Sequence, residues 1–391
     1  MAVTLYAEDF SEKSRLRVLL DHFGVIEDDR EPWRVAHPLP EVLLLVVCGT
    51  IADCDDFDFI AEWGEAHLDF LRRILPYHHG VPTGRWLNAL MNRIDPGLFS
   101  EAFMSWVRET WPRQPDLIAI DGKTSRRSHD RTAGKAPLHL LSAFATKSRL
   151  VLGQQAVADK TNEITAIPVL LERLAAEDGL KGSLVSIDAI GTNPAVATAI
   201  RDAGANYLLA VKANQPTLRA EIDSFFADAG VAGLDTTVDF DKGHGRIEQR
   251  TVTVAREVEW INGDRRFPGE VRLPDVATII KVASRAELVD RCRFETRYYV
   301  SSAKLTAAQA AEAVRSHWAI ENSLHWVLDV TFGDDRSRLR TGHGAKNMAV
   351  VRHFALNLVR AAQDKRTIRL RRKRAGWDPD FLAKILGPLS R

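Results

Sequence analysis

Three acidic residues far apart in the chain stand where their carboxylates could act together. Asp121 and Asp188 each directly follow a short apolar segment, residues 117–120 and 183–187, of the kind that forms a buried strand. Ligands gather at the carboxyl ends of parallel strands in α/β sheets. An aspartate at a strand end can also cap the next turn, so each residue taken alone leaves both interpretations open.

Glu321 lies on the longest helix that the sequence predicts, residues 306–330. Thr306 and Gln309 have the spacing of a capping box at its start. One stripe of this helix is predicted to face the core, and its members are Val314, His317, Glu321, Leu324 and Leu328. A buried carboxylate is costly unless it is paired or binds a cation. The alternative to a cation is a partner such as Arg315 or His325.

A site built from three carboxylates favours Mg²⁺ or Mn²⁺. Two such ions can activate an attacking oxygen and stabilise the leaving oxygen of a phosphoryl transfer, which is the chemistry that DNA cleavage requires. A rival zinc site could form from His317, Glu321 and His325, which share one helix face. These residues lack the His-Glu-x-x-His spacing of zinc hydrolases.

Positive charge is concentrated at the end of the chain. The 391 residues carry a formal net charge of only +1, but residues 336–391 hold 15 Lys and Arg against 3 Asp and Glu. Such a segment is typical of contact with a polyanion, above all nucleic acid. The candidate DNA-binding residues here are Arg369, Arg371, Arg372, Lys373 and Arg374. A solvated basic tail without a specific partner is the alternative.

Four further basic residues are candidates for DNA phosphates. Lys123 closely follows Asp121, and Lys212 comes just after the apolar segment 207–211. Arg246 and Arg250 alternate with His244 and Glu248 on one face of a predicted strand. Arginines there could bind a DNA backbone without reading its sequence. The alternatives are solvated lysines and a strand face with a cross-strand ion pair.

Elements that would position these residues follow a clear order. Residues 1–112 show helical periodicity, and residues 138–157 read as a hairpin between the two aspartate-bearing strands. The chain divides into an N-terminal helical domain (1–112), the first part of a catalytic core (113–214), a β-rich insertion (215–305), the last acidic helix (306–345) and a basic tail (346–391). This order predicts an α/β core with a mixed sheet.

Other function classes are disfavoured by composition and motifs. No apolar run approaches the roughly 18 residues of a membrane helix, and the first residues lack a signal-peptide pattern. Three cysteines, with no Cys-x-x-Cys pair, predict neither a disulfide framework nor a zinc knuckle. A nucleotide-binding Gly-x-x-x-x-Gly-Lys-Ser/Thr loop is absent. We therefore expect a cytoplasmic protein with no membrane contact and no nucleotide cofactor.

The ordered set of short motifs resembles the ISAs-type insertion-sequence transposases, to which the H-repeat-associated proteins are similar. The matching segments are residues 119–123 (AIDGK), 160–164 (KTNEI), 186–189 (SIDA), 211–215 (VKANQ), 244–248 (HGRIE) and 317–326 (HWAIENSLHW). The resemblance implies an RNase H-like core of the DDE type, with Asp121, Asp188 and Glu321 as the catalytic, metal-binding triad.

A transposase of this kind would cleave the ends of an insertion sequence and join the resulting 3′-hydroxyls to target DNA. Its expected cofactor is Mg²⁺ or Mn²⁺, with two ions, and its expected partner is double-stranded DNA. Because two element ends must be brought together, a homodimer on DNA is expected. Two alternatives remain: a transposase-derived DNA-binding protein that no longer cleaves, and a metal-dependent nuclease outside transposition.

Overall fold

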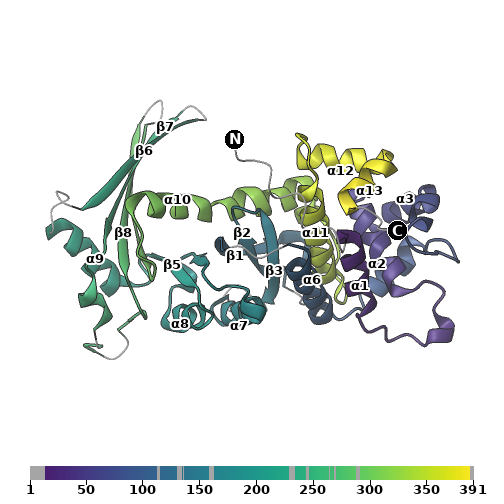
Figure 1. Cartoon of the computed structure of the whole chain (residues 1–391), viewed down its shortest axis with the longest axis horizontal. Helices are drawn as coiled ribbons and strands as arrows, with labels where there is room; N and C mark the ends of the chain where they lie inside the picture. The colour runs from purple at the N-terminus through teal and green to yellow at the C-terminus, as the bar shows by residue number, and fades with distance from the viewer. Residues whose placement is uncertain are drawn as a thin grey trace.

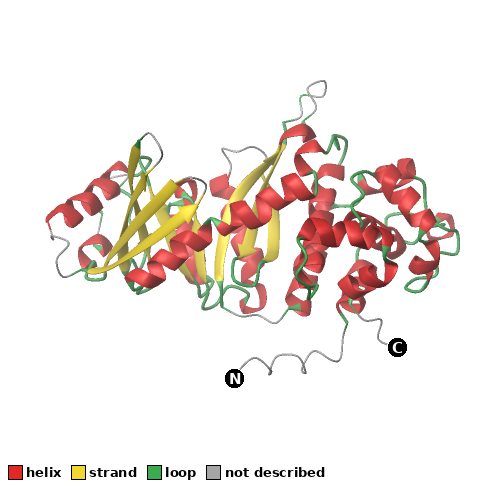
Figure 2. Cartoon of the chain, turned by 90° about the horizontal axis from the view of Figure 1, so that it is seen from above, coloured by secondary structure: helices red, strands yellow, loops and turns green. Residues whose placement is uncertain are grey.

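A computed structural model shows an elongated molecule with helices at one end and strands at the other (Figures 1 and 2). The structure describes residues 14–111, 115–129, 134, 136–157, 163–228, 234–243, 246–263, 265–267, 270–287 and 291–387. Among these residues, no helix combines the length and apolar character needed to cross a bilayer.

The N-terminal region is helical, as predicted. Its helices are α1 (Arg15–Gly24), α2 (Leu39–Ile51), α3 (Phe57–Ala66), α4 (Leu68–Arg72), α5 (Gly84–Met91) and α6 (Pro96–Thr110). Side-chain caps begin several of them, because an oxygen of Asp56, Thr83 or Asp95 accepts a bond from a free amide of the first turn. Every residue of α2 except Pro40 is buried, so this apolar helix forms the centre of the domain.

A single mixed sheet runs through the rest of the molecule. Its strands are β1 (Leu117–Ser125), β2 (Leu138–Ala145), β3 (Leu150–Val157), β4 (Leu184–Ile187), β5 (Asn206–Val211), β6 (Asp235–Gly243), β7 (Arg246–Ala255), β8 (Thr278–Glu287) and β9 (Cys292–Ser301). The strand order is β3-β2-β1-β4-β5-β9-β8-β7-β6. Strands β1, β4 and β5 are parallel, whereas β2 and β3 are antiparallel to their neighbours. This arrangement confirms the predicted α/β core with a mixed sheet.

The β-rich segment continues the sheet of the core. Strand β9 pairs antiparallel with β5, and β8, β7 and β6 follow it outward. Helices α7 (Glu163–Ala175) and α8 (Pro194–Asp202) lie beside the core strands, and α9 (Pro216–Asp228) lies beside the outer strands (Figure 1). The backbone hydrogen bonds between β5 and β9 therefore join the segment to the core sheet, in which β1 contains Asp121 and β4 ends just before Asp188.

The predicted helix at 306–330 is interrupted. Helix α10 (Ala307–His317) begins with the predicted capping box but ends at His317, and two π-helical turns follow, η7 (Ile320–His325) and η8 (Val327–Thr331). A π-turn has a wider hydrogen-bond step than an α-helix, so it rotates the residues that follow it. The expected buried stripe is therefore wrong at Glu321, whose side chain is 57% exposed.

The C-terminal basic segment is not a free tail. It forms α11 (Gly344–Ala361), α12 (Ile368–Trp377) and α13 (Pro379–Leu386), and α11 packs against α2 and α6. Figure 1 shows these helices, drawn from green to yellow, beside the N-terminal domain. Apolar side chains of α13, Leu382, Ile385 and Leu386, are fully buried. The segment read as a tail is thus part of the helical core.

Candidate active site

Sheet register brings the two aspartates together. Ile120 of β1 is paired with Ile187 of the parallel strand β4, so Asp121 and Asp188 lie together at the edge of the sheet where β4 ends. Strand β4 ends before Asp188 as predicted, but β1 continues past Asp121 to Ser125 because it stays paired with β2, so Asp121 lies within its strand. Glu321 reaches this edge from η7, which contacts β1. All three carboxylates line one cavity of about 300 Å³. The three acids selected from the sequence therefore lie around one space.

His325 belongs to the same cluster. Its Nδ1 lies 3.0 Å from Glu321 Oε2 and 3.7 Å from Asp121 Oδ2. Atoms of these three residues lie within 4.8 Å of one another, as ligands of one metal ion would. The His325 side chain is buried, and within the described part of the chain its Nε2 has no hydrogen-bond partner. The sequence predicts His325 as a partner of Glu321 or as a zinc ligand. Its position four residues after Glu321 accounts for the contact between the two side chains.

The electrostatics of Asp121 fit a cation site. Burial raises the pKa of Asp121, and the nearby carboxylates of Glu321 and Asp188 raise it further, against the opposing effects of His325 and the Gly122 amide. Carboxylates crowded in this way repel one another unless a cation lies between them. The carboxylate oxygens of Asp121 and Glu321, with the imidazole of His325 beside them, form a donor set that could hold a divalent cation.

Asp188 is differently placed, because it has a cationic partner. Lys212 Nζ lies 2.7 Å and 2.9 Å from its two carboxylate oxygens, and the Ala189 amide donates to it as well. Burial raises the pKa of Asp188, but the bonds from Lys212 and Ala189 outweigh this and lower it overall. Lys212 was predicted to contact a DNA phosphate. Its side chain is 57% exposed at the cavity, so it can also reach an anion that enters there.

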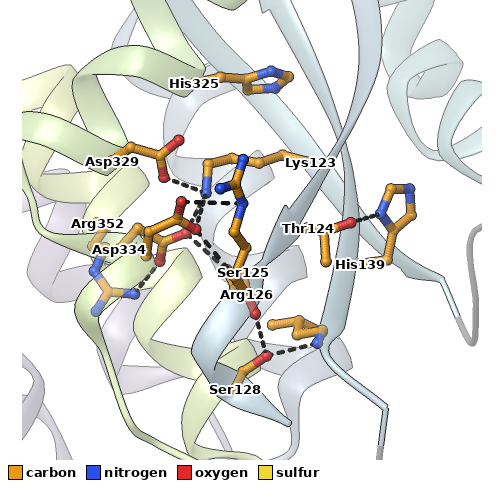
Figure 3. A network of polar contacts seen from close by, with 12 residues as sticks. Lys123, Thr124, Ser125, Arg126, Ser128, His139, His325, Asp329, Asp334 and Arg352 are labelled. Carbon is orange, nitrogen blue, oxygen red and sulfur yellow. Dashed lines mark hydrogen bonds and ion pairs between the residues drawn. The ribbon is translucent and has the colours of Figure 1, made fainter.

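Lys123 has a different role from the one predicted. Its side chain is only 10% exposed, and its Nζ lies 2.6 Å from Asp329 and 2.7 Å from Asp334 (Figure 3). Asp334 in turn bonds to Arg352 at 2.6 Å and accepts from Ser125. Lys123 of β1 is therefore enclosed in an ion-pair network with residues of η8, α11 and the turn between them. The expectation that it contacts a phosphate, or is solvated, does not fit this burial.

The rival zinc grouping is not assembled in this way. His317 Nδ1 lies 2.9 Å from Ser186 Oγ, on the Asp188 side of the cavity. Burial lowers the pKa of His317, which favours its neutral form. Among the described residues, the group that could hold a metal contains Asp121, Glu321 and His325 but neither His317 nor the predicted ligand Asp188.

A groove adjoins the acidic cavity. It has a volume of about 1030 Å³ between α10 and strands β6 to β9, and it shares Arg297, Tyr299 and Trp318 with the cavity. Arg250 lines the groove, but it bonds to Glu248 on its own strand at 2.9 Å rather than across strands. The backbone of Arg246 begins β7, while its side chain, like His244, lies outside the described residues.

The basic cluster on α12 divides into buried and exposed side chains. Arg371 bonds to the Val359 carbonyl and Asp364, and Arg372 bonds to the Thr50 carbonyl. Both are buried, so their expected contact with DNA is inconsistent with the fold. A count of charges does not distinguish a buried arginine from a DNA-binding arginine, so the sequence did not predict this burial.

The other three residues of the α12 cluster remain at the surface. Arg369 and Lys373 are exposed, whereas Arg374 is half-buried and paired with Asp378 at 2.9 Å. The guanidinium of Arg374 also lies 4.7 Å from the centre of the Phe381 ring. Arg369 and Lys373 are therefore the residues of this cluster that are open to a polyanion.

Comparison with known proteins identifies the family. Residues 112–358 match the family described as Transposase DDE domain, and residues 20–107 match the region associated with it. The chain belongs to the DDE transposase family. The H repeat-associated putative transposase YhhI of Escherichia coli is 35% identical over 95% of this chain and 98% of its own length.

Further relatives and one solved structure match different shares of the chain. The putative transposase YncI of Escherichia coli is 34% identical over 96% of both chains. Shorter relatives include an Escherichia coli protein named inactive transposase YbfQ, 36% identical over 17% of this chain. A piggyBac transposase in a synaptic complex with hairpin DNA aligns with a TM-score of 0.43 and 10% identity, over 98% of this chain and 81% of its own.

Proposed function

We propose that this transposase cleaves the ends of an insertion sequence and joins them to target DNA by metal-assisted phosphoryl transfer. The observation that carries the proposal is the convergence of Asp121, Asp188 and Glu321 on one cavity from β1, β4 and η7. Asp121 and Glu321 face one another across His325, and Asp188 lies beside them with Lys212. The catalytic triad is thus proposed from geometry as well as from family membership.

Divalent cations, Mg²⁺ or Mn²⁺ and two in number, would be held by these three carboxylates. When bound, they activate the attacking oxygen and stabilise the leaving oxygen. The chain's own groups prepare the site: His325 orients Glu321 through their 3.0 Å contact, and Lys212 is placed to leave Asp188 for a DNA phosphate. Water attacks first and frees a 3′-hydroxyl, which then attacks a phosphodiester of the target.

The proposed partners are double-stranded DNA, as element ends and as target, and a second copy of the chain on that DNA. The groove beside the cavity, whose lining carries arginines among carboxylates, would give a strand a route to the acids, provided that Arg250 exchanges Glu248 for a phosphate. The experiment that tests the function uses the purified protein with Mg²⁺ and measures both cleavage of intact element ends and strand transfer of pre-cleaved ends. Cleavage without joining would instead favour a nuclease, and binding without either reaction would favour a silent DNA-binding protein.

Replacing His325 by Ala is expected to weaken Mn²⁺ binding by about 10–100-fold, because Glu321 loses the group that orients it. Mn²⁺ affinity of the DNA-free protein, followed by electron paramagnetic resonance, checks this. His22 of α1, which contacts Glu109, provides the matched control. Equal Mn²⁺ affinity in the His325→Ala and His22→Ala proteins would show that His325 does not support the site.

Replacing both Arg369 and Lys373 by Gln is expected to reduce the salt dependence of DNA binding. The slope of log affinity against log salt becomes shallower by about 0.9 for each phosphate that the protein no longer neutralises. Lys181→Gln is the control, because this residue lies before β4, at the end opposite Asp188. A slope unchanged by the double substitution would remove the exposed face of α12 from the DNA interface.

A further inference from the structure

The C-terminal end of α11 links the sheet edge to the turn that carries Glu321. Arg360 donates from one nitrogen to the carbonyl of Arg149, in the turn between β2 and β3, at 2.8 Å. From another nitrogen it donates to the carbonyl of Ser323, within η7 and two residues after Glu321. One guanidinium thus spans two segments that lie far apart in the sequence.

The chemical surroundings of Arg360 are unusual for a cation. Among the described residues, the polar partners of its guanidinium are these two carbonyls, with no carboxylate, and the Phe144 ring lies 5.1 Å away. Burial lowers the pKa of Arg360. A cation that is partly withdrawn from water without an opposite charge nearby lowers the stability of the fold. Its hydrogen bonds to the two carbonyls, one of them in η7, offset part of this cost.

The turn that Arg360 contacts is a π-helical turn. π-Helical turns are rare and occur mostly at functional sites. In η7 the amide of Trp326 bonds to the Glu321 carbonyl, in the five-residue step of a π-turn. A donor from outside the helix that binds the Ser323 carbonyl fixes this turn at its centre. The same turn presents Glu321 and His325 toward Asp121.

A second residue of α11 anchors the helix independently. The Asn357 side chain is fully buried, and it both accepts from the Val151 amide and donates to the Val151 carbonyl, at 3.0 Å and 2.9 Å. This contact fixes α11 to the edge strand β3. Asn357 and Arg360 therefore make separate contacts from α11, and of the two only Arg360 reaches η7.

We propose that Arg360 is a positioning residue of the acidic site, whose planar fork holds η7 against the sheet so that Glu321 and His325 stay beside Asp121. The inference rests on the proposed function, because it assigns Glu321 to the cation site. A lysine cannot replace this fork, since its single ammonium lacks the two rigid donor directions that reach separated carbonyls.

The test compares full-length Arg360→Lys, Arg360→Ala and Asn357→Ala proteins with the wild type. Arg360→Lys is expected to raise the Mn²⁺ dissociation constant by about 10-fold, as loss of an indirect support does. Amide hydrogen exchange within residues 321–328 should accelerate by about 10-fold, while that of residues 310–314 stays unchanged. Asn357→Ala should lower the melting temperature but leave Mn²⁺ affinity unchanged, because it spares the carbonyl of Ser323.

The inference is overturned if Arg360→Lys matches the wild type in both measurements, or if Asn357→Ala weakens Mn²⁺ binding equally. Should Arg360→Ala fail to fold, Arg360→Lys still decides, because it keeps the charge and most of the side chain. Asp121→Asn separates the two proposals. If the Asp121→Asn protein binds Mn²⁺ as tightly as the wild type, the proposed cation site is wrong. Hydrogen exchange in η7 then still tests whether Arg360 holds this turn.

Discussion

Asp121→Asn is expected to lower the rates of end cleavage and strand transfer by at least about 10³-fold, while DNA binding is kept. The asparagine has nearly the same shape but supplies no negative charge to a cation. Loss of a cation's stabilisation of the transition state is worth several kcal/mol, which corresponds to this factor in rate. Asp188→Asn and Glu321→Gln should behave alike, since all three line the same cavity. Gel assays of cleavage and joining, with DNA affinity measured alongside, check this.

Asp116 provides the matched control for Asp121. It lies just before β1, five residues away, and bonds to the amides of Lys147 and Ser148 at the other end of the strand. Asp116→Asn should therefore leave the rates within a few-fold of the wild type. Joining at the wild-type rate by both Asp188→Ala and Glu321→Ala would show that the catalytic assignment is wrong.

Asp334→Ala is expected to lower the free energy of unfolding by about 3–5 kcal/mol, the usual cost of removing one partner from a buried ion pair. Asp334 is 5% exposed and contacts Lys123, Arg352 and Ser125 (Figure 3). Its loss leaves the buried Arg352 without this carboxylate and Lys123 with Asp329. Denaturant unfolding measures the change. Asp335→Asn is the control, because that side chain is partly exposed and its Lys123 contact is 3.8 Å long.

The same network predicts a pH dependence. Burial opposes ionisation of Asp334, but Arg352 and Lys123 outweigh it and lower the pKa of this carboxyl from 3.8 to about 2. A lowered pKa adds stability above pH 3.8, and this stability is lost as the pH falls toward 2. Wild type should therefore lose about 2 kcal/mol more than Asp334→Asn over this range. Parallel pH profiles for the two proteins would contradict the network's role.

Much of the site could be predicted because its signals are local. The apolar segments before Asp121 and Asp188 are short and end at the acid, and the structure places β4 up to Ile187. The capping box at Thr306 likewise depends on four consecutive residues and is present. Parallel pairing of β1 and β4 then follows from the order of strands and helices, and it brings the two aspartates to one edge.

The fate of the basic residues could not be predicted, because it depends on tertiary packing. Lys123 follows Asp121 in sequence, yet acids from residues 329–335 enclose it. Arg372 belongs to a run of charges, yet α12 turns it inward onto the Thr50 carbonyl. Elements far away in the sequence decide whether a long basic side chain faces water or makes internal hydrogen bonds. Within α12, the spacing of apolar residues does not indicate which face of the helix is buried.

The π-helical turns could not be predicted from the sequence either. Residues 306–330 have helical periodicity throughout, and no local signal marks the wider turn at η7. As a result, the sequence placed Glu321 on a buried stripe, whereas its side chain is largely exposed to the cavity. The contact with His325 survives this change, because residues four apart remain neighbours on the turn.

The most direct test is an anomalous diffraction map of the protein soaked with Mn²⁺. The proposed function predicts anomalous peaks in the cavity, with Asp121, Asp188 and Glu321 oxygens at coordination distances of about 2.0–2.3 Å. It also predicts that Lys212 moves off Asp188 when the cations bind. A map without a peak beside Asp121, at Mn²⁺ concentrations that support strand transfer in solution, would contradict the central claim.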